Sequence, residues 1–220
     1  MEALGTTTAE LANRYSGKSS QPEKTLASTP ASRTDRVRHW PETVVHGNWR
    51  GFEASVAVQC LEAVDAARWP LLLAGCPGSG KSVAACLLAR QSPSWRFWEA
   101  SRLLALIVSA RTSDSKTAPW PVWPELCETP GQTVELTESQ MLRHIETAGM
   151  LVLDDVGTRD LRDAQADVFL TILNLRVNKP TIITTNCDRA KLTAAVGARS
   201  VSRILAGSVV KFPQVDRRQA

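Results

Sequence analysis

Residues 75–82 read Gly75-Cys76-Pro77-Gly78-Ser79-Gly80-Lys81-Ser82. This stretch fits the phosphate-binding loop pattern G-x-x-x-x-G-K-[ST] at every required position. Residues 70–74 before it are short and apolar, as a buried parallel strand should be, and residues 82–90 after it are rich in Ala and Leu and favour a helix. The order strand, glycine loop and helix predicts an α/β fold built around this turn.

The chemistry of this loop follows from its residue types. Its glycines let the backbone bring several N–H groups close to a polyphosphate, and the helix that begins near Lys81 aims its positive dipole end at the same anion. We expect Lys81 to reach the β- and γ-phosphates and the Ser82 hydroxyl to bind Mg²⁺. The stretch from Gly75 to Ser82 is therefore the predicted cofactor-binding site.

Length and composition limit the class of protein. The chain has 220 residues, which suits one α/β domain plus a tail, and a formal net charge of +4, which permits a nucleic-acid partner without requiring one. Its five cysteines show no C-x-x-C spacing, which argues against zinc and for a reducing compartment. No apolar run has membrane-spanning length and no signal-peptide core is found, so we expect a cytoplasmic protein with no membrane partner.

The first 40 residues differ in composition from the remainder. They are poor in large apolar groups and rich in Ser, Thr, Pro and Ala, which is typical of a flexible segment. Two interpretations are equally supported, a docking peptide for a partner protein and a disordered tail. We expect residues 41–220 to form the folded domain.

A second chemical element follows about seventy residues after the loop. Residues 150–155 read MLVLDD, a buried apolar strand that ends in two carboxylates. Asp154 would hold Mg²⁺ opposite Ser82, directly or through water, and Asp155 would orient or deprotonate the attacking water. Their place after a phosphate loop makes this pattern, which is weak alone, a strong signal.

Two later segments add candidate polar groups. Residues 180–186 predict another buried strand, which ends at Asn186, and ligands of open α/β sheets bind at the carboxyl ends of the strands. Asn186 would position water near the γ-phosphate or would simply form a turn. Arg199 and Arg203 lie four residues apart on one face of a helix expected over residues 198–205. They suit this molecule's own nucleotide, a neighbour's nucleotide, DNA phosphate or an ordinary charged surface.

Four local predictions concern the remaining segments. Ser101 is expected to cap a helix that ends near residue 111, and Thr137 one that ends near residue 147. Residues 112–133 are expected to form an irregular loop, in which Trp120 and Trp123 would stack on single-stranded bases or, as we favour, cover a hydrophobic edge. Residues 50–52 would touch a nucleotide base or form a plain surface loop.

Together these motifs resemble the AAA+ ATPases, and within them the DnaC/IstB-like group. The resemblance covers residues 49–218 and rests on GCPGSGKS (75–82), LVLDDVGT (151–158), KPTIITTN (179–186) and SRILAGSVVKF (202–212). It implies a three-layer P-loop NTPase with a five-stranded parallel sheet of order 5-1-4-3-2 and no helical lid domain. One departure is Asp155, which stands where many AAA+ proteins have Glu.

The resemblance also assigns roles to the candidate residues. Lys81 and Ser82 become Walker A, Asp154 and Asp155 become Walker B, and Asn186 becomes sensor 1. Arg203 matches the arginine finger that acts on the adjacent subunit's ATP, and Arg199 is the second candidate for that role.

The implied function is that of an ATP-dependent loader of a replicative DNA helicase, of phage or mobile-element type. The protein would bind ATP with Mg²⁺ and single-stranded DNA, form an ATP-dependent homo-oligomer, and be a weak ATPase when alone. One alternative is an IstB-like ATPase helper of a DNA transposase. Another, from a different class, is a nucleotide-binding scaffold that barely hydrolyses ATP.

Overall fold

The computed structural model describes residue 49 and residues 52–121 and 133–216 of the chain. The predicted flexible segment of residues 1–40, together with Trp123, lies outside the described residues. The helices and strands follow the chain as α3 (Ala54–Asp65), β1 (Leu71–Ala74), α4 (Lys81–Ala89), β2 (Trp95–Glu99), α5 (Ala100–Thr112), β3 (Thr117–Pro121), β4 (Thr133–Thr137), α6 (Glu138–Thr147), β5 (Met150–Asp154), α7 (Asp163–Leu175), β6 (Thr181–Thr185), α8 (Arg189–Val196), α9 (Ala198–Ile204) and β7 (Ser208–Lys211).

The main sheet has five strands in the order β2-β5-β6-β1-β7, and every neighbouring pair is parallel. Numbered along the chain, these strands give the order 5-1-4-3-2 that the resemblance predicted. All five strands end at the same edge of the sheet, which we call the carboxyl edge; the opposite edge, where they begin, is the amino edge. The predicted α/β fold with a five-stranded parallel sheet is confirmed.

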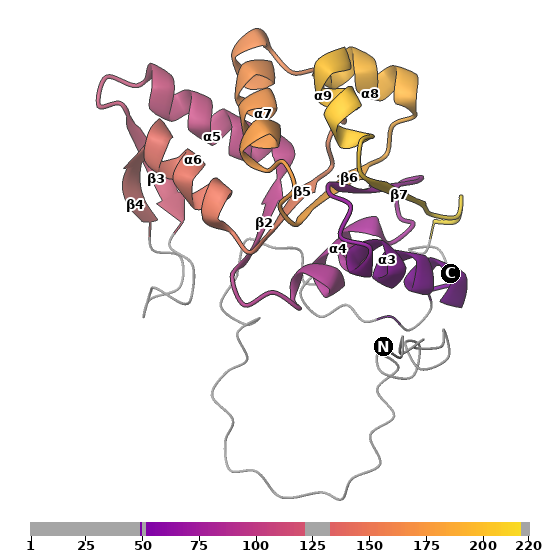
Figure 1. The fold of residues 1–220 in the computed structure, drawn as a ribbon. Helices are drawn as coiled ribbons and strands as arrows, with labels where there is room; N and C mark the ends of the chain where they lie inside the picture. The colour runs from indigo at the N-terminus through magenta and orange to yellow at the C-terminus, as the bar shows by residue number, and fades with distance from the viewer. Residues whose placement is uncertain (1–48, 50–51, 122–132, 217–220) are drawn as a thin grey trace, which may run out of the picture.

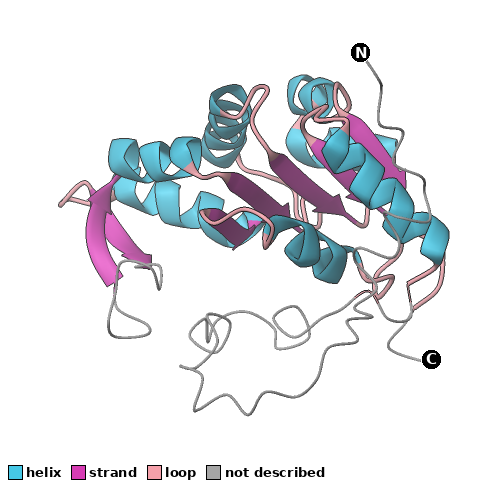
Figure 2. Ribbon diagram, turned by 60° about the horizontal axis from the view of Figure 1, so that its bottom comes forward, coloured by secondary structure: helices cyan, strands magenta, loops and turns pink. Residues whose placement is uncertain are grey.

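Helices cover both faces of this sheet (Figure 1). α3 and α4 pack on one face, and α5, α7, α8 and α9 lie on the other, with α6 beside α5. Figure 2 shows the resulting three layers, with the β3–β4 pair standing at one end of them. The central strands are apolar on both faces because both are covered: β5 is buried at Met150, Leu151, Val152 and Leu153. No helix in the described part of the chain is both long and apolar enough to cross a membrane.

The segment that follows α5 differs from the sequence prediction. Residues 117–121 are not irregular: they form β3, which pairs antiparallel with β4, so that Trp120 lies opposite Val134. Proline is tolerated here because a two-stranded sheet consists of edge strands, which leave some N–H positions without a partner strand.

Trp120 is a buried side chain in this pair. It is 2% exposed and its ring lies 4.8 Å from that of Trp98 and 6.0 Å from that of His144. The interpretation of Trp120 as a cover for a hydrophobic edge is confirmed, and the interpretation of this residue as a base-stacking platform is wrong.

The start of α5 also differs from the sequence prediction. Ser101 does not cap α5: the helix begins at Ala100, and the Ser101 hydroxyl donates to the Glu99 carboxylate at 2.5 Å. The Thr137 cap is confirmed, since its hydroxyl accepts from the Gln140 N–H while the Gln140 side chain accepts from the Thr137 N–H.

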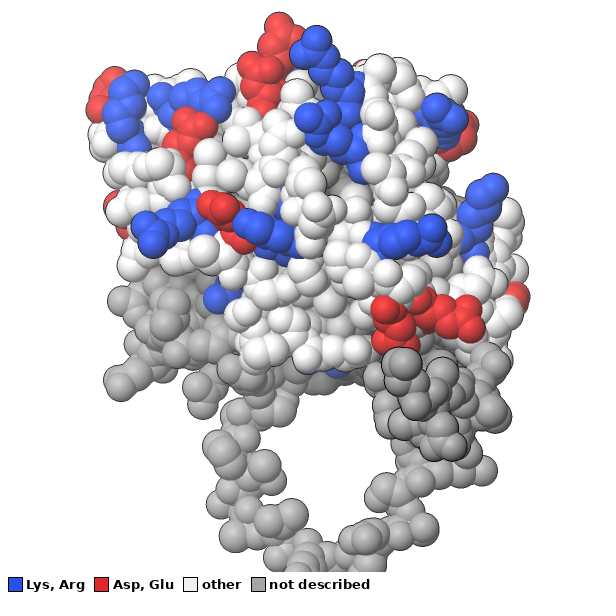
Figure 3. All heavy atoms as spheres, viewed as in Figure 1, with Lys and Arg blue, Asp and Glu red and all other residues white. Residues whose placement is uncertain are grey.

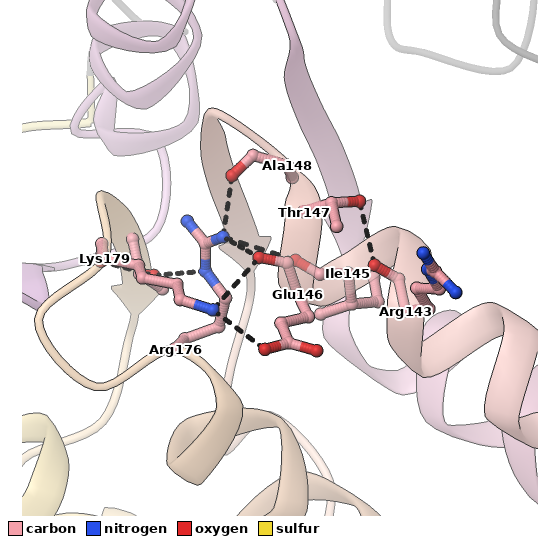
Figure 4. A network of polar contacts seen from close by, with 8 residues as sticks. Arg143, Ile145, Glu146, Thr147, Ala148, Arg176 and Lys179 are labelled. Atoms are coloured by element: carbon pink, nitrogen blue, oxygen red, sulfur yellow. Dashed lines mark hydrogen bonds and ion pairs between the residues drawn. The ribbon is translucent and has the colours of Figure 1, made fainter.

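The amino edge is held together by a buried arginine (Figure 4). Arg176 follows α7 and is only 3% exposed, and burial lowers its pKa to about 10. Its guanidinium donates to the carbonyls of Ile145, Glu146, Ala148 and Pro180 and to the Thr181 hydroxyl. One side chain thereby ties the end of α7 to the end of α6 and to the start of β6.

Candidate nucleotide site at the carboxyl edge

The glycine loop joins β1 to α4 at the carboxyl edge. Gly78 and Gly80 adopt φ angles of 77° and 95°, which side-chain-bearing residues rarely reach. The Gly80 carbonyl accepts the first helical hydrogen bond from the Ala84 N–H at 2.9 Å. The loop therefore continues without a break into the N-terminus of α4, where the helix dipole is positive.

Lys81 is a buried charge inside this loop. Its side chain is 5% exposed, and its Nζ lies 2.7 Å from the Cys76 carbonyl oxygen and 3.3 Å from the Ser79 Oγ. The ammonium group is thus enclosed by the backbone curve that the glycines create. This geometry suits an anion held between the loop backbone and the lysine.

Asp154 connects the loop to the tips of two strands. Its Oδ1 accepts from the Ser82 hydroxyl at 2.8 Å and from the Thr184 hydroxyl at 2.6 Å. Burial raises the pKa of Asp154, and the charge of Asp155 adds to that effect, while the bonds from Thr184 and Ser82 and the charge of Lys81 oppose it. The carboxylate is consequently one that a cation would stabilise.

The next residue turns sharply away from the strand direction. Asp155 has a φ of 57°, in the left-handed region, which Asp tolerates better than most residues. Its N–H donates to the Thr184 hydroxyl at 2.9 Å, and its Oδ1 accepts from the Asn186 Nδ2, also at 2.9 Å. Asp155 and Asn186 therefore lie together at the tips of adjacent strands.

Thr184 is a member of the site that the sequence analysis did not single out. Its side chain is fully buried, and its hydroxyl joins Asp154 to the backbone of Asp155. The signal available in the sequence was a hydroxyl-bearing residue near the end of the apolar strand that leads to Asn186. The polar set then runs without interruption through Ser82, Asp154, Thr184, Asp155 and Asn186.

The donor atoms fit a magnesium ion. Ser82 and Asp154 offer hard oxygen ligands 2.8 Å apart, the ligand type that Mg²⁺ prefers. Among the described residues no group of three or more His, Cys, Asp or Glu side chains is placed to hold a metal. Phosphate oxygens and water would therefore complete the coordination, as is usual for this ion.

An apolar hollow lies beside the glycine loop. It is lined by Phe52, Glu53, Val56, Ser79, Phe212, Pro213 and Val215. Phe52 meets Phe212 edge to face, with ring centroids 6.3 Å apart. The sequence analysis placed Ser79 and residues 50–52 near a nucleotide, but it assigned no such place to Phe212 or Pro213, because an aromatic residue and a proline at the end of a last strand give no sign of what they face.

A larger groove opens on the acidic strand tips. It has a volume of about 650 Å³ and runs from Asp154 and Asp155 past Glu99 and Arg102 to Pro119 of β3. Its lining is mostly apolar, and the acidic groups outnumber the single arginine.

Arg203 lies away from this site. α9 leads into β7, so its last turn lies near the amino edge, and the Arg203 Nε donates to the Asn174 Oδ1 at 2.6 Å on the last turn of α7. Strands of four or five residues separate the two edges by about 13–16 Å. The structure therefore brings Lys81, Ser82, Asp154, Asp155 and Asn186 together and leaves Arg203 at the opposite edge.

Charge is mixed on the face that Figure 3 shows. Lys and Arg side chains are scattered over it, with a group above α7 and α9 and acidic side chains beside that group. On this face the basic groups are separated by neutral and acidic surface.

Comparison with known proteins identifies the fold. No family model and no curated protein matches the sequence. The structure of DnaI matches with a TM-score of 0.57 and 20% identity over 80% of this chain and 95% of that chain. AMPPCP-bound DnaA from Aquifex aeolicus matches with a TM-score of 0.55 and 17% identity over 75% of this chain and 48% of that chain.

A third match is the replication initiator DnaA bound to AMPPCP and single-stranded DNA, with a TM-score of 0.53 and 18% identity over 74% of this chain and 46% of that chain. The chain thus spans less than half the length of these DnaA structures. At such identities the likeness is one of fold. The chain shares a three-layer α/β fold with the DnaI and DnaA structures, in line with the fold class that the sequence predicted.

Proposed function

We propose that the protein binds ATP with Mg²⁺ at the carboxyl edge and hydrolyses it. The observation that supports this most directly is the unbroken polar set from Ser82 to Asn186 beside the glycine loop. The likeness in fold to two DnaA structures solved with AMPPCP adds support.

Each residue of the site then has a task. The loop backbone and Lys81 bind the phosphates, and the apolar hollow between Phe52 and Phe212 receives the base. Ser82 and Asp154 would hold Mg²⁺, which supplies charge neutralisation for the transferred phosphoryl group. Asp155, oriented by Asn186, accepts a proton from the attacking water.

The test is steady-state ATP hydrolysis by the full chain and by Asp155→Asn. The substitution keeps the side chain's size and its contact with Asn186 but removes its basicity, so turnover should fall about a hundredfold or more while nucleotide affinity is retained. Unchanged turnover would remove Asp155 as the base. Absence of any nucleotide binding by the unmodified chain would overturn the proposal.

We further propose that the site is completed by a second copy of the chain. Arg203 is exposed and lies at the amino edge, too far from the phosphate loop of its own subunit to act there. A finger supplied in trans explains why the protein alone would be a weak ATPase. Specific activity should therefore rise with protein concentration.

The proposal of a trans finger is tested by mixing variants. Arg203→Ala and Asp155→Asn are each expected to keep only a small residual turnover, and an equimolar mixture should recover activity because some sites combine an intact Asp155 with a neighbour's Arg203. Arg199→Ala is the matched comparison on the same helix. Recovery in mixtures with Arg199→Ala but not Arg203→Ala would give the finger to Arg199.

At the biological level we propose a loader of a replicative DNA helicase, of phage or mobile-element type, that binds single-stranded DNA. The sequence resemblance to the DnaC/IstB-like group and the likeness in fold to DnaI support this role. The IstB-like helper of a transposase remains the second candidate because the same motifs support it. Binding of the full chain to a purified replicative helicase, or instead to a transposase from the same genome, separates the two.

A further inference from the structure

Arg203 is held by one neutral hydrogen bond. Its Nε donates to the Asn174 Oδ1 at 2.6 Å, and both side chains are on exposed residues. Within the described residues no other hydrogen bond or ion pair to the Arg203 guanidinium is found. A guanidinium has five N–H donors, so the edge formed by its two terminal nitrogens stays open to an external anion.

We infer that Asn174 is a positioning residue, which holds the Arg203 guanidinium so that its terminal nitrogens meet the phosphate bound by a neighbouring copy. This inference rests on the proposed trans finger. A guanidinium binds phosphate best when its planar fork is correctly oriented, and anchoring Nε fixes that plane without occupying the phosphate-binding edge.

The backbone that carries Asn174 is firmly anchored. Arg176, two residues further on, is buried and bonds to carbonyls at the end of α6 and at the start of β6 (Figure 4). The last turn of α7 is therefore fixed to the amino edge, and Asn174 provides a fixed point for a long, exposed side chain.

The neutral amide of Asn174 also matters. An amide oxygen accepts one hydrogen bond and leaves the positive charge of Arg203 available. A carboxylate at the same position would pair with the guanidinium through two parallel bonds and would occupy the phosphate-binding edge. Comparison of Asn174→Ala with Asn174→Asp therefore separates the need for an acceptor from the need for a neutral acceptor.

Arg199 provides the contrast on the same helix. It is exposed, and no hydrogen bond or ion pair joins it to another described residue. It has no anchor comparable to Asn174, so the geometry favours Arg203 as the finger.

The test uses the full chain at concentrations where ATP turnover depends on assembly. For Asn174→Ala we expect kcat to fall about five- to tenfold with KM unchanged, because the phosphates are bound by the other copy. Asn174→Asp should lower kcat at least as far although it keeps an acceptor oxygen. Ser202→Ala removes an exposed hydroxyl next to Arg203 and should leave both constants unchanged.

Two controls separate positioning from general damage. In an Arg203→Ala background, Asn174→Ala should have no further effect, since the group it positions is gone. In nuclear magnetic resonance spectra without nucleotide, the Arg203 Nε–Hε signal should shift and exchange faster with water in Asn174→Ala, and this readout does not depend on ATP turnover.

The outcomes are distinguishable. Turnover that requires Arg203 but is unaffected by Asn174→Ala would overturn this inference and leave the trans finger intact. A fall in kcat that persists in the Arg203→Ala background would overturn it in favour of a purely structural role. A wild-type chain without turnover at any concentration would overturn the proposed function, and the inference with it.

Discussion

The two edges of the main sheet hold buried positive charge in different surroundings. At the amino edge, the Arg176 guanidinium is surrounded by carbonyl oxygens and one hydroxyl of its own chain. At the carboxyl edge, Lys81 lies inside a glycine loop beside a carboxylate whose pKa burial raises. A charge bonded mainly to the ends of helices and strands holds elements together, whereas one enclosed by a turn and facing acidic strand tips is arranged for a ligand.

The largest effect is expected from removing the amino-edge charge. Arg176→Met leaves several buried acceptors without a donor, so the free energy of unfolding should fall by about 3–5 kcal/mol. Urea unfolding measures the loss. If the amino edge is purely structural, the folded fraction of Arg176→Met should bind nucleotide as tightly as the unmodified chain. A stable Arg176→Met variant that binds nucleotide weakly would instead show that the amino edge serves binding.

Lys81→Ala tests the carboxyl edge in the opposite sense. It removes a buried ammonium group whose desolvation cost opposes the gain from its hydrogen bonds to Cys76 and Ser79, so the unfolding free energy should change little. Nucleotide affinity should fall about 100- to 1,000-fold, the usual cost of losing one strong donor to an anion. Titration calorimetry and thermal unfolding of the same sample provide both numbers.

Thr184→Val tests whether the polar residues at the carboxyl edge act as one connected set. The bond from Thr184 favours ionised Asp154, so its loss raises the pKa of Asp154 further and removes a partner of the Asp155 N–H. We expect kcat to fall about tenfold and the acidic limb of the pH–rate profile to move to higher pH. Thr184→Ser keeps the hydroxyl, so its kcat and the acidic limb of its pH–rate profile should stay close to those of the unmodified chain.

The smallest effect belongs to a site at neither edge. Thr137→Ala removes one half of the capping box of α6 and should lower the free energy of unfolding by about 1 kcal/mol. Turnover per folded molecule should not change. A loss of turnover would mean that α6 takes part in the site, and the contrast between the edges would then be too simple.

The sequence predicted the carboxyl edge far better than the amino edge. The loop, the acidic strand tip and Asn186 are marked by residue types that chemistry demands at fixed places, and the structure brings them together. Arg176 follows a helix and resembles an ordinary surface charge, because nothing in a local pattern reveals which carbonyls will surround it. Its role depends on contacts with α6 and β6 that only the folded chain creates.

The β3–β4 pair was missed for a related reason. Pro119 and Pro121 predict irregular chain, since proline breaks the interior of a sheet. A pair of strands without further neighbours tolerates them, and the burial of Trp120 against Trp98 stabilises the arrangement. Phe212 and Pro213 were overlooked as well, because their place beside the glycine loop follows from the pairing of β7 with β1.

The separation of Arg203 from the glycine loop has a consequence for symmetry. A contact that joins one edge of the first subunit to the opposite edge of the next is heterologous, so a two-fold dimer cannot form it reciprocally. Repetition of such a head-to-tail contact generates either a closed ring or an open helical filament, according to the rotation between neighbours. In a filament, the terminal subunit would carry one site that no neighbour completes.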